Sequence, residues 1–120
     1  MKDKPRDIRE RTFQFAVDVV RLCEVLALKP GVIRTLARQL LRAGTSIGAM
    51  VEEAQAAQSR ADFNNKYNIA LKEARESIYW LRLLNVSGIH ADEQSEALRA
   101  EAEQIARIIG SIIVSTKTQS

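Results

Sequence analysis

The chain has 120 residues, a length typical of one domain with a modest hydrophobic core. Hydrophobic residues make up 46% of it and charged residues 28%, a mixture that excludes a disordered protein. No apolar run approaches the roughly 18 residues of a membrane-spanning helix, and the N-terminal segment lacks the apolar centre of a secretion signal. We therefore expect a cytoplasmic protein with no membrane partner. Its single cysteine, Cys23, excludes an internal disulfide and is expected to be buried.

The net charge of +3 is unevenly distributed along the chain. Residues 1–42 contain ten Lys and Arg against five Asp and Glu, whereas residues 43–90 contain five of each. Residues 91–120 contain three against five. The first third is thus the basic part of the chain, which permits a nucleic-acid partner without requiring one.

Apolar residues recur at helical spacing along most of the chain, and no stretch alternates with the period of two that indicates a strand. The pattern predicts four helices, which cover about residues 7–28, 31–57, 60–86 and 92–115. Short connections place consecutive helices side by side in opposite directions. We therefore expect an all-α fold, an antiparallel up-down-up-down four-helix bundle that forms one domain over residues 1–120. In the second helix, Gly44 and Gly48 allow another helix to approach closely.

Turn-forming and capping residues mark the expected helix ends. Pro30 suits the first turn of the second helix. Ser59 can cap the third helix while Asp62, three residues later, reaches back toward the turn. Gly88 can supply the positive φ angle that closes the third helix.

Three of the predicted helices carry apolar residues on a second face. These residues are Val17, Val20, Val25 and Leu28 in the first helix, Ile69, Trp80 and Leu83 in the third, and Ile108 and Ile113 in the fourth. A helix that is apolar on two faces is buried on two faces. We therefore expect a subunit interface and a cyclic homo-oligomer. The alternative is a monomer with scattered exposed apolar side chains.

Four carboxylates in the second and third helices raise the question of a metal site. They are Glu52, Glu53, Glu73 and Glu76. Bundles that hold paired metals combine Glu with Glu-x-x-His, whereas the third helix has Glu at both positions and His90 lies in a predicted loop. We therefore expect no metal, no cofactor and no catalytic residue, with a carboxylate metal enzyme as the less favoured alternative. Glu73 and Glu76 share the face of Ile69 and Trp80, so we expect them to pair with basic groups at a helix or subunit seam.

Three arginines recur at steps of four residues in the second helix. Arg34, Arg38 and Arg42 should form one curving ridge on its surface. The N-terminal segment adds further cations, which are Lys2, Lys4, Arg6, Arg9 and Arg11. Arginine matches phosphate geometry, and an oligomer would repeat the ridge around a ring. The pattern indicates binding to the RNA or DNA backbone without base readout; a solvated basic face is the alternative.

Residues 40–84, "LLRAGTSIGAMVEEAQAAQSRADFNNKYNIALKEARESIYWLRLL", resemble the family of four-helix-bundle proteins encoded in intervening sequences of bacterial 23S ribosomal RNA genes. The residues that carry the resemblance are Arg42, Ser46, Ile47, Glu53, those at 59–63, Lys66, Ile69, Ala70, Glu73, Glu76, Trp80 and Leu81. It extends over about residues 10–110 and implies an antiparallel bundle that assembles as a homopentamer. Where the family commonly has Asn, this chain has Met50, so a polar site that used this Asn together with the glutamates is not expected here.

The resemblance includes the accessory protein of diversity-generating retroelements, which has this fold and works with a reverse transcriptase and nucleic acid through a basic surface. That particular role is not carried over to this chain. The sequence and the resemblance together favour a non-enzymatic homo-oligomer, a pentamer by family likeness, that binds RNA or DNA. The alternative is a scaffold that binds another protein and has no nucleic-acid role.

Overall fold

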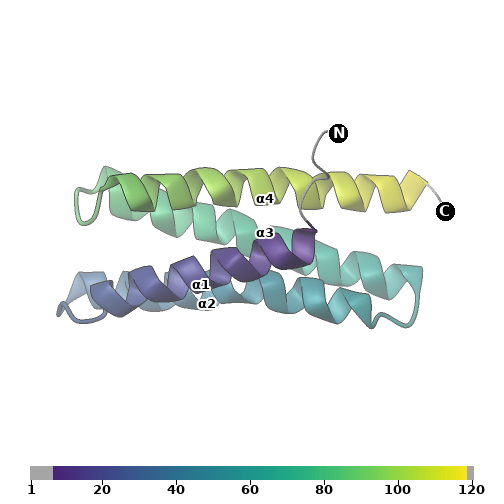
Figure 1. Ribbon diagram of the computed structural model, residues 1–120, viewed down its shortest axis with the longest axis horizontal. Helices are drawn as coiled ribbons and strands as arrows, with labels where there is room; N and C mark the ends of the chain where they lie inside the picture. Colours follow the sequence, from purple (N-terminus) through teal and green to yellow (C-terminus); the bar gives the residue numbers. More distant parts are fainter. Residues whose placement is uncertain (1–6, 119–120) are drawn as a thin grey trace.

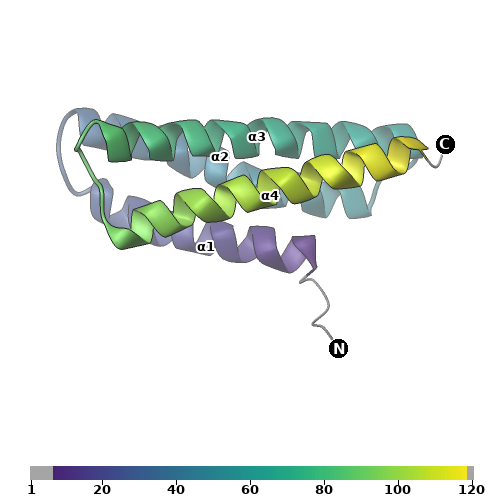
Figure 2. The same ribbon diagram turned by 90° about the horizontal axis from the view of Figure 1, so that it is seen from above.

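The computed structural model describes residues 7–118, and the secondary structure in this part of the chain is entirely helical. The four helices are α1 (Ile8–Leu26), α2 (Val32–Gln55), α3 (Arg60–Val86) and α4 (Glu93–Thr118). Each helix packs against the next one in the chain, and α4 also packs against α1 (Figures 1 and 2). The prediction of an all-α fold of four packed helices is confirmed. No helix in the described range has the length and apolar character needed to cross a bilayer.

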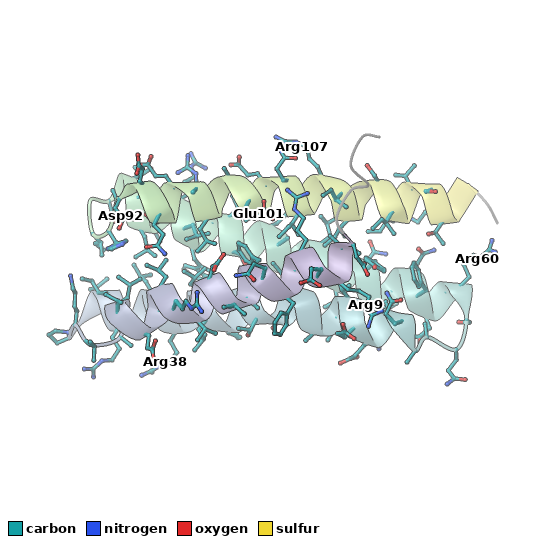
Figure 3. The ribbon with its side chains drawn as sticks, viewed as in Figure 1. Arg9, Arg38, Arg60, Asp92, Glu101 and Arg107 are labelled. Atoms are coloured by element: carbon teal, nitrogen blue, oxygen red, sulfur yellow. The ribbon has the colours of Figure 1, made fainter. Side chains whose placement is uncertain are left out.

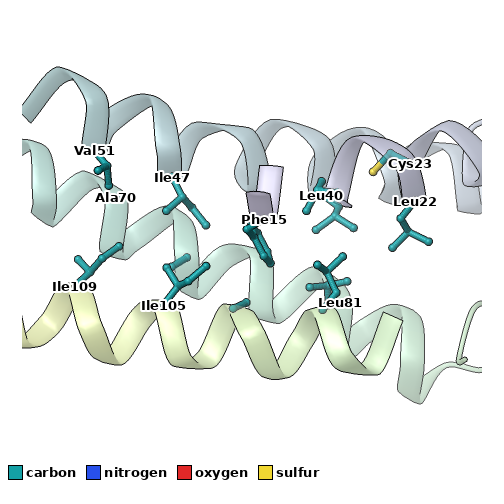
Figure 4. Close-up of a cluster of buried hydrophobic side chains, with 14 of the residues drawn as sticks. Phe15, Leu22, Cys23, Leu40, Ile47, Val51, Ala70, Leu81, Ile105 and Ile109 are labelled. Carbon is teal, nitrogen blue, oxygen red and sulfur yellow. The ribbon is translucent and has the colours of Figure 1, made fainter. Parts of the chain in front are cut away.

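One apolar stripe of each helix builds a shared core. Phe15, Ile47, Leu81 and Ile105 come from the four different helices and are each at most 1% exposed. Figure 4 shows these side chains converging between the helices. In α4 the buried stripe ends at Ile113, which is only 6% exposed. The prediction that Ile113 belongs to a second, outward face was therefore wrong, because the step of four residues from Ile109 keeps it on the core side.

Helices α1 and α2 approach closely at two glycines, as predicted. A Cβ atom at Gly44 would lie 2.9 Å from both γ-methyl carbons of Val19, and one at Gly48 would lie 3.3 Å from the backbone oxygen of Thr12. Side chains at these two positions would therefore push α1 away from α2. The close approach buries Val19 completely.

The capping residues define the ends of α3. Ser59 Oγ accepts a hydrogen bond from the backbone N–H of Asp62 at 3.0 Å, and Asp62 Oδ2 accepts one from the N–H of Gln58 at 3.4 Å. At the other end, Gly88 has a φ of +80°, as expected. The expectation for α2 was wrong, because Pro30 lies outside the helix and Gly31, with a φ of +83°, is the N-cap.

The start of α4 is held by a reciprocal pair of hydrogen bonds. Asp92 Oδ1 accepts from the backbone N–H of Ser95 at 2.8 Å, and Ser95 Oγ accepts from the N–H of Asp92 at 3.2 Å. The hydrogen bond from the Ser95 backbone is the main reason that the pKa of the Asp92 carboxyl is lowered. This cap fixes where the chain turns from α3 into α4.

Candidate nucleic-acid interface

Two of the three predicted α2 arginines lie together on the surface. Arg34 and Arg38 are both exposed, and within residues 7–118 neither forms an ion pair with a carboxylate. Arg38 extends outward from α2 in Figure 3. Both arginines line a groove of about 320 Å³ between α1 and α2, whose other lining residues are Val20, Cys23, Glu24, Ala27, Ala37 and Leu41. Two unpaired guanidinium groups therefore stand beside a largely apolar depression.

Arg42 has a different environment from its two neighbours in the predicted ridge. Its guanidinium donates hydrogen bonds to Glu73 Oε1 at 3.3 Å and to Glu76 Oε1, both on α3. Trp80 Nε1 donates to the same Glu76 oxygen at 3.4 Å. These four residues, Arg42, Glu73, Glu76 and Trp80, form what we call the α2–α3 cluster. Its two carboxylates outnumber its one cation, so a phosphate that approached Arg42 would also be repelled by Glu73 and Glu76. Phosphate contact by Arg42 stays a prediction.

The described N-terminal arginines tie α1 to other helices. Arg9 Nε donates to Glu52 Oε2 at 3.2 Å, and Arg11 donates to both carboxylate oxygens of Glu101 at 2.7 and 3.0 Å. These hydrogen bonds are the largest cause of the raised pKa of each arginine. Figure 3 labels Arg9 and Glu101. The other predicted N-terminal cations, Lys2, Lys4 and Arg6, lie outside the described residues.

The predicted interface residues fall into two groups. In α1, Val20 is 44% exposed while Val17 is half-buried. In α3, Leu83 is 36% exposed, whereas the remaining members, Ile69, Glu73, Glu76 and Trp80, are half-buried. The sequence interpretation missed Phe13, which is 66% exposed and precedes Val17 by one helical turn. Helical spacing alone could have placed Phe13 on the same face as Val17 and Val20.

The remaining candidate groups for chemistry lie apart from one another. Glu52 pairs with Arg9, and Glu53 lies 3.5 Å from Lys66 Nζ. Among residues 7–118, no three His, Cys, Asp or Glu side chains form a group that could hold a metal ion. Cys23 is buried as predicted, its thiol donates to the backbone oxygen of Ala37 at 3.3 Å, and burial raises its pKa to about 11. A thiol with this pKa carries almost no thiolate at neutral pH.

Within residues 7–118, the protein is a bundle of four helices with exposed, unpaired arginines on the surface of α2. The chain belongs to the family of 23S rRNA-intervening sequence proteins, whose model matches residues 4–111. A crystal structure of a protein of unknown function from the S23 ribosomal protein family of Bacteroides thetaiotaomicron VPI-5482 is 43% identical. The match covers 89% of this chain and 98% of that one, with a TM-score of 0.82. The family resemblance expected from the sequence is confirmed. A search of curated proteins finds no match.

Proposed function

We propose that this protein is a non-enzymatic bundle that binds the phosphate backbone of RNA or DNA. The observation that carries the proposal is the pair of exposed arginines, Arg34 and Arg38, one helical turn apart and without a carboxylate partner in the described part of the chain. Unpaired guanidinium groups can bind phosphate without first giving up an ion pair.

We further propose that the helices run up and down in an antiparallel bundle that associates into a homo-oligomer, a pentamer by family resemblance. Between α2 and α3, Glu53 is paired with Lys66 and the earlier Arg42 with the later Glu76. As the residue number increases from Arg42 to Glu53 along α2, the number of the paired residue on α3 decreases from Glu76 to Lys66. This order is typical of two helices that run in opposite directions. The exposed Phe13 and Val20 on α1 support association, because exposed apolar faces are often protein interfaces.

The test is the salt dependence of binding to a fluorescein-labelled 20-nucleotide oligouridine, measured by anisotropy on nuclease-treated protein. Replacing Arg34 and Arg38 together by Gln should lower the slope of log K against log salt by about 1.4, or about 0.7 for each single-strand phosphate released. The control variant R21Q/R107Q removes the same charge from two other exposed positions. Binding that is insensitive to salt, or equal in the two variants, would overturn the proposal.

The apolar groove between α1 and α2 supports a second candidate, a scaffold that binds another protein. Val20, Ala37 and Leu41 would contact an apolar side chain of that partner. This candidate predicts that a protein partner co-purifies after nuclease treatment and is lost from Leu41→Asp. Salt-sensitive RNA binding without such a partner favours the first candidate.

A further inference from the structure

The exposed residues of α3 include cations but no carboxylate, although the helix as a whole contains both. Between Asn65 and Val86, the exposed residues of α3 are Asn65, Asn68, Lys72, Arg75, Tyr79, Arg82, Leu83 and Val86. We call this set the α3 outer face. It contains three cations and no carboxylate. The two glutamates of the same stretch, Glu73 and Glu76, are half-buried and bonded to Arg42 of α2.

The other described helices have exposed carboxylates that dilute their cations. These are Glu10 and Glu24 in α1, Glu52 and Glu53 in α2, and Glu93 and Glu96 in α4. Lys72, Arg75 and Arg82 also have no ion-pair partner among residues 7–118. The α3 outer face is therefore a surface of uncompensated positive charge.

An aromatic ring lies within this row of cations. Tyr79 is 56% exposed and meets Trp80 edge-on, with ring centroids 5.1 Å apart and an interplanar angle of 74°. With a rise of about 1.5 Å per residue, Tyr79 follows Arg75 by about 6 Å along the helix and precedes Arg82 by about 4.5 Å. Lys72 and Arg82 are about 15 Å apart along the axis. Trp80 packs against one edge of the Tyr79 ring, and more than half of the surface of Tyr79 remains exposed.

We propose that the α3 outer face binds single-stranded nucleic acid, with Lys72, Arg75 and Arg82 on phosphates and Tyr79 stacked on a base. Charge complementarity selects this occupant, because three uncompensated cations attract a polyanion. The combination of a basic track with an exposed aromatic ring is the one that single strands require, since a duplex hides its base faces. The inference rests on the proposed function and assigns it a surface separate from Arg34 and Arg38.

The intrinsic fluorescence of the unmodified protein gives the first readout. Trp80 is the only tryptophan, and it contacts Tyr79, so its emission reports on that ring. Titration with a 20-nucleotide oligouridine should change the Trp80 emission, and added salt should reverse the change. A 20-base-pair RNA duplex at the same concentration should leave the emission unchanged. An emission change that is equal for strand and duplex would overturn stacking on Tyr79.

Charge variants then separate this face from the rest of the surface. The variant K72Q/R75Q/R82Q should lower the slope of log K against log salt by about 2, or about 0.7 for each of three phosphates. The matched control R21Q/K29Q/R107Q removes the same three charges from exposed positions elsewhere and should leave that slope within about 0.5 of the unmodified protein. Far-ultraviolet circular dichroism and the melting temperature check that both variants are folded.

Variants of Tyr79 test the stacking contact. Tyr79→Ala should weaken oligouridine binding roughly tenfold, because base stacking on an aromatic ring is worth on the order of 1–3 kcal/mol. Tyr79→Phe, which keeps the ring, should restore it. Duplex binding should be unchanged in both variants.

The outcomes distinguish this inference from the proposed function. If the unmodified protein binds neither oligouridine nor the RNA duplex, the proposed function is overturned together with the inference; if it binds the duplex alone, only the inference is overturned. If it binds oligouridine, and R34Q/R38Q weakens binding while K72Q/R75Q/R82Q behaves like its matched control, only the inference is overturned. If K72Q/R75Q/R82Q instead changes the mass of the particle in light scattering, the α3 outer face is a contact between copies and the inference is again wrong.

Discussion

At the scale of single residues, Gly44 sets how closely α1 and α2 can pack. Its missing Cβ would lie 2.9 Å from Val19, which is fully buried and cannot easily rotate because it is β-branched. Overpacking a core costs about 1–3 kcal/mol, whereas alanine gains about 1 kcal/mol over glycine in helix propensity. We therefore expect Gly44→Ala to lower the free energy of unfolding by about 1 kcal/mol, measured by urea denaturation.

Gly110 of α4 provides the matched control. A Cβ there would meet no atom within 4 Å, so only helix propensity changes. Gly110→Ala should raise the free energy of unfolding by about 1 kcal/mol. Equal stabilisation by both substitutions would show that α1 can move away from α2 without cost.

Ionisation of Cys23 makes the free energy of unfolding vary with pH in the alkaline range. Burial raises its pKa in the folded state to about 11 from an ordinary value of 9.0. A raised folded-state pKa gives stability that is fully present below pH 9 and is lost as the pH rises toward 11, because the unfolded thiol ionises first. The loss should be on the order of 2 kcal/mol.

The measurement compares urea unfolding of the unmodified protein and of Cys23→Ala between pH 8 and 11. This range includes both the ordinary pKa of the Cys23 thiol and its raised pKa in the folded state. Tyr67, whose pKa is also raised by burial, is present in both proteins, so its effect cancels in the difference. The difference in unfolding free energy between the unmodified protein and Cys23→Ala should become smaller as the pH rises toward 11. A difference that stays constant with pH would contradict the burial of Cys23.

At the scale of helices, the α2–α3 cluster fixes the alignment of its two helices. Glu73 has only 14% of its side chain exposed, against 60% for Glu52 in the surface pair with Arg9. A double-mutant cycle of Arg42→Gln and Glu73→Gln should give a coupling free energy of about 0.5–1 kcal/mol that decreases with salt. The same cycle on Arg9 and Glu52 is the control and should give a weaker coupling. Equal couplings would mean that burial does not strengthen the cluster.

Helical periodicity predicted most of this architecture because burial depends on spacing within one helix. Phe15, Ile47, Leu81 and Ile105 each belong to an apolar pattern at helical spacing, and all four are buried. The partner of Arg42 was not predictable in the same way, because it depends on how two helices are aligned in space. Glu73 and Glu76 were expected to pair with a basic group, but Arg42 was assigned to phosphate binding.

The α3 outer face was missed because charge was summed along the sequence. Residues 43–90 contain five cations and five anions, so this segment looked neutral. A helix places residues three or four positions apart on the same side and residues one position apart on different sides. Lys72 and Arg75 therefore point away from the bundle while Glu73 and Glu76 meet Arg42. Counting charge by helix face would have found the cationic row.

At the scale of the whole molecule, the exposed apolar residues of α1 predict association. Light scattering should give a mass well above the 13.4 kDa of one chain, and five times that value if the family resemblance extends to assembly. Val20→Asp should lower the mass, because it places a charge in the expected interface. Val114→Asp, at a position on α4 that is 61% exposed against 44% for Val20, should leave it unchanged. A mass of one chain for the unmodified protein would contradict the interface.

The short first helix has a dynamic consequence. α1 has 19 residues against 24 to 27 in the others, and it begins short of the α2–α3 turn (Figure 1). Opening this end exposes less apolar surface than opening the middle around Phe15. Amide hydrogens near Ala54 and Phe63 should therefore exchange with deuterium well before those near Ile47 and Ala74. The molecule would then unfold progressively from this end, in a partial step that precedes global unfolding.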